Sequence, residues 1–213
     1  MNRAITAETS RAVAVLEKLR EDITNCVYES GQFITESEIS HKFNVSKTPA
    51  REALNCLCQE GLLVKIPRKG YIIKQLSFTE LSNLCYFRGI LECGAVEWAI
   101  RYASDSELDQ IIELAHKQID IDDEDFYNRY NDLNVNFHLS IAQLSKNTYL
   151  VSALQGVLNQ LRRDLAMDGR INLERSLDMH VQIAEALKRR DLEQARRITV
   201  DQIQVVEKRL YLH

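Results

Sequence analysis

The chain has 213 residues, 45% of them hydrophobic, and a formal net charge of −4. This length allows one large domain or two smaller ones, and the apolar share supports a packed core, which excludes a disordered chain. No run approaches the 18 apolar residues of a membrane-spanning helix, and the first residues lack the apolar core of a secretion signal, so we expect a cytoplasmic protein with no membrane partner.

Proline and charge divide the chain near residue 76. Both prolines, Pro49 and Pro67, lie in the first third, and the proline-free remainder favours long helices. Residues 1–76 carry 11 Lys and Arg against 9 Asp and Glu, a net charge of +2. Residues 77–213 carry 16 against 22, a net charge of −6. We therefore predict a basic domain over 1–76 and an acidic one over 77–213.

The basic domain begins with three predicted helices. Apolar residues from Val15 to Val27 recur at the spacing of one helix face and predict a helix over 9–29. A Thr35-x-x-Glu38 capping box predicts a second helix over 36–43. A third helix is expected to start at Pro49, a favoured first-turn residue, and to end at Gly61. Two short helices joined by about four residues form a helix-turn-helix.

In a helix-turn-helix, the amino end of the second helix enters the DNA major groove. Hydroxyl and basic side chains suited to bases and phosphates gather there, namely Ser46, Lys47, Thr48 and Arg51. The planar guanidinium of Arg51 could form two hydrogen bonds to a guanine, whereas Lys47 suits a phosphate.

A short hairpin is predicted after Gly61, with strands over 62–66 and 71–75. Its Pro and Gly turn carries Arg68 and Lys69, which would form a basic wing beside the third helix. The alternative is a solvated turn whose charges contact nothing.

Six helices are predicted in the acidic domain, over 77–102, 105–120, 123–145, 147–168, 172–190 and 191–211. Capping boxes mark two of the starts, Ser77-x-x-Glu80 and Ser104-x-x-Glu107. The fold class is therefore mainly α, a winged helix-turn-helix followed by an antiparallel all-α bundle.

Two histidines stand out on the apolar faces of this bundle. Asn134 and His138 are four residues apart and share one face of a helix, while His180 lies on the inward face of another. Two imidazoles and an oxygen ligand could hold a divalent ion. Two buried, hydrogen-bonded histidines without a metal are the alternative, and the spacing alone leaves both open.

Three segments resemble a known DNA-binding family. VSKTPAREAL over 45–54, LCQEGLL over 57–63 and PRKGYII over 67–73 are similar, in order and spacing, to the winged helix-turn-helix of GntR-family bacterial transcription regulators. The resemblance implies DNA contacts by a set of residues around the start of the third helix and in the wing: Ser46, Lys47, Thr48, Arg51, Arg68, Lys69 and Gly70. Lys47 stands where the family usually has Arg.

The acidic domain resembles the FCD ligand-binding domain of the FadR subfamily. The resemblance lies in Arg88-x-x-Leu91-Glu92, in N-x-x-F-H over 134–138 and in H-x-x-I-x-x-A-L-x-x-x-D over 180–191. Many such domains bind a divalent metal, such as Zn²⁺, which helps to hold a carboxylate effector. The resemblance thus implies Asn134, His138 and His180 as metal ligands, with Gln202 where a further His is usual. Neutral amides are weak ligands, which predicts weaker metal binding.

The carboxylate effector that the resemblance implies would be held by arginine. Arg88 and either Arg162 or Arg163 are the candidates, because a guanidinium suits a carboxylate. Together these features imply a homodimeric transcription regulator that binds a near-palindromic operator in double-stranded DNA and responds to a small organic acid.

Two other functions remain open at this point. One is a metal-dependent enzyme built around His138 and His180, although the chain has no nucleophile motif such as G-x-S-x-G. The other is a helical interaction module whose basic domain binds nucleic acid without sequence preference.

Overall fold

The computed structural model describes residues 2–120, 123, 125–166 and 173–210. The chain forms two compact units, Met1–Leu76 and Ser77–His213, and we describe each by itself.

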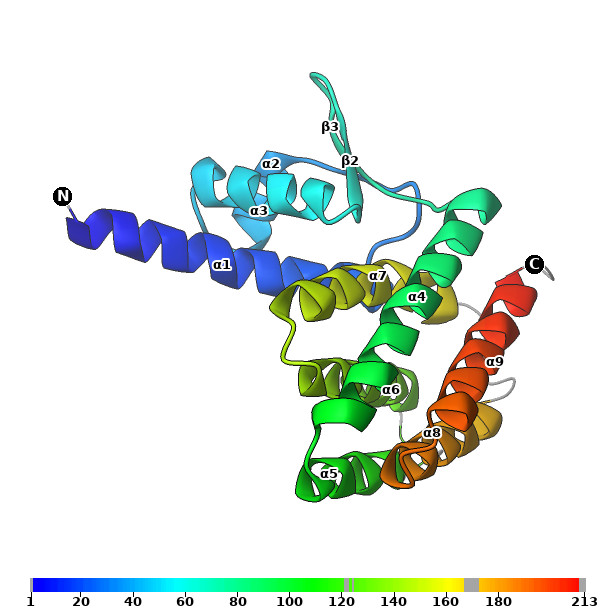
Figure 1. Cartoon of the computed structure of the whole chain (residues 1–213). Helices are drawn as coiled ribbons and strands as arrows, with labels where there is room; N and C mark the ends of the chain where they lie inside the picture. The colour runs from blue at the N-terminus through cyan, green and yellow to red at the C-terminus, as the bar shows by residue number, and fades with distance from the viewer. Residues whose placement is uncertain (1, 121–122, 124, 167–172, 211–213) are drawn as a thin grey trace. The chain divides into compact units, whose positions relative to one another are not determined.

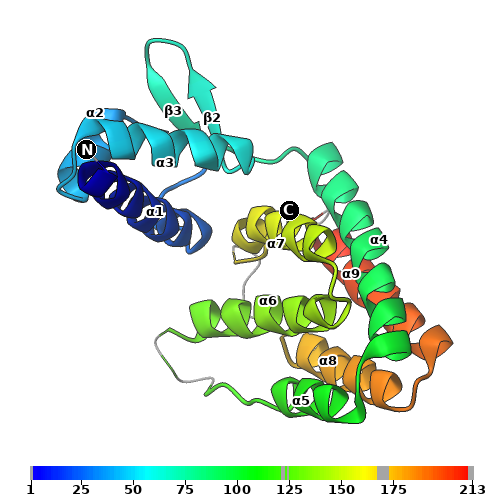
Figure 2. The ribbon, with the colours of Figure 1, turned by 60° about the vertical axis from the view of Figure 1, so that its left-hand side comes forward.

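The first unit holds a helix-turn-helix and a small sheet (Figures 1 and 2). Its core gathers apolar side chains from α1 (Asn2–Thr24), α2 (Glu36–Lys42) and α3 (Lys47–Gln59), among them Leu19, Ile23, Ile39, Leu54 and Leu57. Its elements are α1 (Asn2–Thr24), β1 (Phe33–Ile34), α2 (Glu36–Lys42), α3 (Lys47–Gln59), β2 (Leu63–Ile66) and β3 (Gly70–Ile73). The predicted hairpin wing is confirmed.

The sheet contains a strand that the sequence did not predict. Its order is β1-β3-β2 and both pairings are antiparallel, with Phe33 opposite Ile72 and Leu63 opposite Ile73. At the start of β3, Gly70 has φ +123°, and a Cβ there would lie 2.7 Å from the backbone oxygen of Ile34. Glycine at this position therefore lets β1 approach the hairpin.

Several predicted helix boundaries in the described residues differ from the structure, and two of the helix starts lie at Asn2 instead of residue 9 and at Phe126 instead of residue 123. α1 ends at Thr24, not at residue 29, because Cys26 turns the backbone to φ 60° and Val27 is exposed. α3 begins at Lys47 with Ser46 as its N-cap residue, so Pro49 lies within the first turn, where its missing N–H leaves no hydrogen bond unmade. The helix predicted over 105–120 is α5 (Asp105–Ala115), which ends five residues earlier than predicted.

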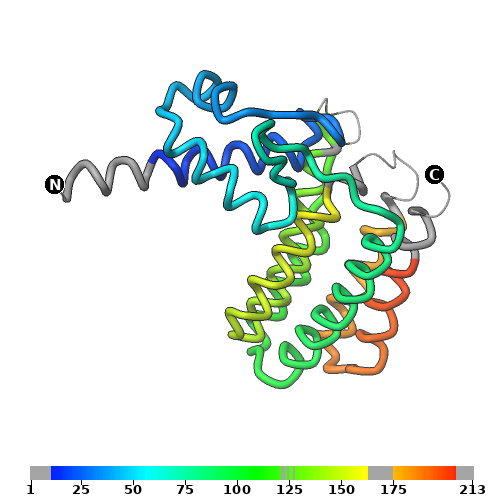
Figure 3. Tube along the Cα trace, turned by 90° about the horizontal axis from the view of Figure 1, so that it is seen from above, coloured from blue at the N-terminus to red at the C-terminus, as the bar shows by residue number. Residues whose placement is uncertain are grey.

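The described regular elements of the second unit are all helices, which confirms the fold class. Its elements are α4 (Phe78–Tyr102), α5 (Asp105–Ala115), α6 (Phe126–Leu144), α7 (Thr148–Ala166), α8 (Leu173–Lys188) and α9 (Leu192–Leu210). The capping boxes at Ser77 and Ser104 both form. α4 runs beside α9 and also packs against α6 and α7, and α8 packs against α5 and α9 (Figures 1 and 3). No helix in the described ranges is long and apolar enough to cross a membrane.

Candidate nucleic-acid interface and effector cavity

The first turn of α3 presents the side chains that a DNA contact needs. Ser46, Lys47 and Thr48 are exposed, whereas Pro49 and Ala50 are buried against the core. A helix amino terminus also carries unpaired backbone N–H groups and a partial positive charge, both of which favour phosphate.

The tip of the wing adds a second basic surface. Arg68 and Lys69 are exposed between β2 and β3, and Arg68 adopts φ 64° in the turn. Figure 2 shows the hairpin projecting away from α3 within the first unit. The predicted DNA contacts therefore lie on two exposed segments of the same unit, the start of α3 and the wing.

Arg51 is exposed but already engaged. Its Nε and Nη2 donate to Glu36 Oε1 and Oε2 at 2.9 and 2.8 Å, and this hydrogen bonding from Arg51 lowers the pKa of Glu36. The hydroxyl of Tyr71, on β3, lies 3.4 Å from Glu36 Oε1 and 3.2 Å from Asn55 Oδ1. The edge of the Arg51 guanidinium that was expected to bind a guanine is thus hydrogen-bonded to Glu36. This contact joins α3 to α2, and the hydroxyl of Tyr71 connects Glu36 to the wing. Sequence reasoning missed Glu36, which resembles any acidic residue in the first turn of a helix.

A buried polar network joins three helices of the second unit. Arg88 Nε donates to Glu92 Oε1 at 2.5 Å within α4, and Arg88 Nη2 lies 2.9 Å from His138 Nε2 on α6. Glu92 Oε2 lies 2.9 Å from His138 Nδ1. His180 Nε2, on α8, lies 3.3 Å from His138 Nε2, and the His180 ring stacks on Phe137 at 4.2 Å.

The contacts of His138 assign its proton. A carboxylate only accepts hydrogen bonds, so His138 donates from Nδ1 to Glu92. Its Nε2 is then the acceptor for the guanidinium of Arg88. This orientation uses both ring nitrogens of His138 within the protein.

The charges of the network balance. Burial disfavours an ionised Glu92, but the charge of Arg88 and the neighbouring His138 outweigh it and lower the pKa of Glu92 to about 2. Burial lowers the pKa of both histidines, and Arg88 acts in the same direction, although Glu92 opposes the change. At neutral pH the network therefore holds one cation, one anion and two neutral imidazoles.

The other two predicted metal ligands, Asn134 and Gln202, form no hydrogen bond to Arg88, Glu92, His138 or His180 within the described part of the chain. Asn134 is buried one turn before His138. Gln202 Nε2 donates to Ser176 Oγ at 3.3 Å, and its buried Oε1 has no hydrogen-bond partner among the described residues. Within the same residues, no three His, Cys, Asp or Glu side chains are grouped to hold a metal ion.

The arginines predicted to hold an effector lie in different places in the structure. Arg88 lies within the network, while Arg162 Nη1 donates to Asp132 Oδ1 at 2.6 Å, between α7 and α6. The side chain of Arg163 lies outside the described part of the chain. Glu92, which the sequence offered only as part of a motif, completes the network.

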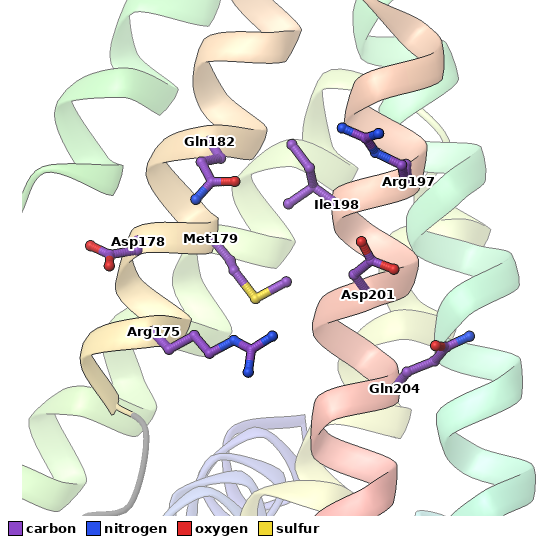
Figure 4. Close-up of a pocket in the computed structure, with 8 residues that line it drawn as sticks. All are labelled: Arg175, Asp178, Met179, Gln182, Arg197, Ile198, Asp201 and Gln204. Atoms are coloured by element: carbon purple, nitrogen blue, oxygen red, sulfur yellow. The ribbon is translucent and has the colours of Figure 1, made fainter.

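An outer groove lies between α8 and α9. Figure 4 shows Arg175, Met179 and Gln182 of α8 facing Arg197 and Ile198 of α9. The groove also includes Asp178, Asp201 and Gln204, and all of its polar side chains are exposed. Two arginines and two aspartates balance in charge, so this is a solvated surface and the buried network is the stronger candidate site.

Comparisons with known proteins agree on one class of relatives. The family model described as bacterial regulatory proteins, gntR family, matches residues 11–73, and the FCD domain model matches residues 83–204. The HTH-type transcriptional repressor RspR of Escherichia coli strain K12 is 26% identical over 191 residues, covering 88% of this chain and 83% of that protein. The HTH-type transcriptional regulator YdhC of Bacillus subtilis strain 168 is 30% identical over 186 residues, covering 84% and 81%.

A solved structure has the same fold. E. coli McbR/YncC superposes with a TM-score of 0.78 over 95% of this chain and 97% of that one, at 19% identity. At that identity the likeness concerns the fold alone.

Proposed function

Because the chain belongs to the GntR family of bacterial transcription regulators and carries an FCD domain, we propose that it binds a near-palindromic operator as a homodimer under the control of a small carboxylate effector. Regulators of this family bind DNA operators and typically dimerise. Since its relatives are transcription regulators, the chain is a DNA-binding regulator and not a metal-dependent enzyme.

The DNA-binding role is supported by the first turn of α3 and the wing. Lys47 and Thr48 would contact phosphates and base edges from the helix start, and Arg68 and Lys69 would contact the backbone beside it. Two copies related by a two-fold axis would contact two half-sites, which is why the operator should be near-palindromic.

Arg51 has a double role in this proposal. Its bond to Glu36 holds the start of α3 against α2, and the Nη1 group is left for a base because it has no partner among the described residues. A guanidinium fixed on one side offers its remaining donors to a base in one orientation.

The effector role is supported by one observation, the buried guanidinium of Arg88, whose side chain is 2% exposed. A cation held in an apolar interior is a strong partner for a carboxylate. The cavity lined by Glu92, His138, Ile183 and Thr199 does not admit a water-sized sphere, so an effector would need another arrangement of these helices. An effector that binds such an arrangement better would shift its population and so change DNA affinity.

Operator binding by variants tests this function. After selection of a preferred site from random DNA, Arg51→Ala should lose about 1–3 kcal/mol of discrimination against wrong bases. Lys69→Ala should weaken binding to all sequences alike and lower the slope of log affinity against log salt by about one. Lys117→Ala, in the second unit, is the matched control and should change neither quantity.

The same titration examines the effector. Small mono-, hydroxy- and dicarboxylates, each paired with its amide analogue, should include an acid that changes operator affinity while its amide does not. Selection of no preferred site, or equal losses on specific and random DNA for both variants, would contradict the DNA-binding proposal. A full panel without effect would contradict the effector proposal alone.

A further inference from the structure

The buried network bears directly on the metal that the FCD resemblance implies. We propose that the guanidinium of Arg88 takes the position of that metal in this chain, so that the cavity is held together by an internal cation. The proposal concerns the protein without effector and does not depend on which effector it binds.

The first argument is the single lone pair of an imidazole nitrogen. His138 donates from Nδ1 to Glu92, so only Nε2 could bind a metal. Arg88 Nη2 lies 2.9 Å from that same nitrogen. A Zn²⁺ ion would bind along this lone pair at about 2.0–2.1 Å, which leaves no room for the guanidinium. With Arg88 in the position that it has here, metal and guanidinium are therefore mutually exclusive partners of His138 Nε2.

The second argument is the donor set. Asn134 and Gln202 offer only neutral amides, and within the described ranges no three His, Cys, Asp or Glu side chains are placed so that they could hold a metal ion together. Glu92, the nearest carboxylate, already accepts from Arg88 and His138. Gln202 Oε1 is a buried acceptor without a hydrogen-bond partner in the described chain, and a single neutral oxygen is a poor ligand for Zn²⁺.

The third argument is charge. Arg88 and Glu92 neutralise each other in an interior where their side chains are 2% and 5% exposed. A divalent ion beside His138 would add two positive charges next to a buried guanidinium, and the described residues of this unit offer no further buried carboxylate to balance them.

Arg88 also supplies the structural link that a metal would supply. From α4 it reaches His138 on α6, and His138 contacts His180 on α8. Three helices are thus connected through one cation, and chelation of metals should leave this connection intact.

Metal binding by the full chain tests the proposal first. Protein produced in zinc-supplemented medium should contain far less than one metal per protomer by elemental analysis. Neither a chelator nor added Zn²⁺ or Mn²⁺ should shift its melting temperature. Near-stoichiometric metal, or a melting temperature lowered by the chelator, would overturn the proposal.

Two variants then test the role of Arg88. Gln202→His supplies the third imidazole but keeps Arg88, and we expect calorimetry to detect no stoichiometric Zn²⁺ binding. Arg88→Met combined with Gln202→His removes the competing cation and should bind one Zn²⁺ per protomer. Stoichiometric zinc in the single variant, or none in a folded double variant, would overturn the assignment. The wild-type and single-variant measurements keep Arg88, so they decide the question even where the double variant fails to fold.

Discussion

Replacing Glu92 by Gln should destabilise the second unit strongly. Glu92 and Arg88 are almost fully buried, with Oε1 2.5 Å from Arg88 Nε and Oε2 2.9 Å from His138 Nδ1. At an effective dielectric constant of about 20, two unit charges about 3 Å apart attract by roughly 5 kcal/mol. Gln keeps the size of the side chain, but it removes this attraction and turns an N–H donor toward other donors.

The expected loss is about 3–5 kcal/mol, the usual effect of removing one partner from a buried ion pair. At about 2–4 °C per kcal/mol for a chain of this size, the melting temperature should fall by about 6–20 °C. Urea unfolding followed by circular dichroism, at a fixed protomer concentration, measures the free energy directly.

Two controls isolate the buried charge. Glu97→Gln lies one and a half turns further along α4 and breaks ion pairs with Arg101 and Arg196 that are partly exposed, so it should change stability by less than about 1 kcal/mol. Replacing both Arg88 and Glu92 by Met removes both charges, and this double variant should be more stable than Glu92→Gln. A Glu92→Gln effect no larger than that of Glu97→Gln would refute the reasoning.

Two further predictions concern acid and the wing. The pKa of Glu92 is about 2 in the fold against an ordinary 4.5, so its stabilisation is complete above pH 4.5 and is lost as the pH falls toward 2. The lowered pKa values of His138 and His180 act in the same direction below about pH 6.5, and urea midpoints that rise on acidification would contradict both effects. Gly70→Ala should destabilise the first unit by about 1–3 kcal/mol, because it combines a positive φ with a contact of 2.7 Å to the backbone oxygen of Ile34. Gly31 also has a positive φ, +78°, but a Cβ there would have no atom within 4 Å, so Gly31→Ala should lose less stability. Equal losses in the two variants would show that the contact with Ile34 is unimportant.

Local chemistry decided how well the fold could be predicted. The capping boxes at Thr35, Ser77 and Ser104 placed three helix starts correctly, because each box is completed by residues three positions apart. The predicted end of α1 was wrong, because the helix stops before the left-handed backbone of Cys26, and cysteine is not a residue type that indicates such a turn. β1 was missed because its two residues are extended only through their pairing with β3.

The candidate site divides in the same way. Helical periodicity was enough to place His138 and His180 on inward faces, and both are buried. The choice of ion-pair partners was not predictable. Arg88 and Glu92 are four residues apart in one helix, a spacing equally common on solvated faces, and Glu36 meets Arg51 from a different helix.

Arg51 and Arg88, the two arginines of the proposed functions, each form an ion pair with a carboxylate. The exposure of each pair determines how easily it can open. The side chain of Arg51 is 54% exposed, and exposed ion pairs contribute less than about 1 kcal/mol, so approaching DNA can compete with Glu36 for its donors. Arg88 is buried, and its separation from Glu92 would leave two uncompensated charges in the interior. An effector of the proposed kind would therefore have to share Arg88 with Glu92 or bring its own carboxylate as the pair opens. This requirement favours acidic effectors over neutral ones and links their binding to movement of α4 against α6.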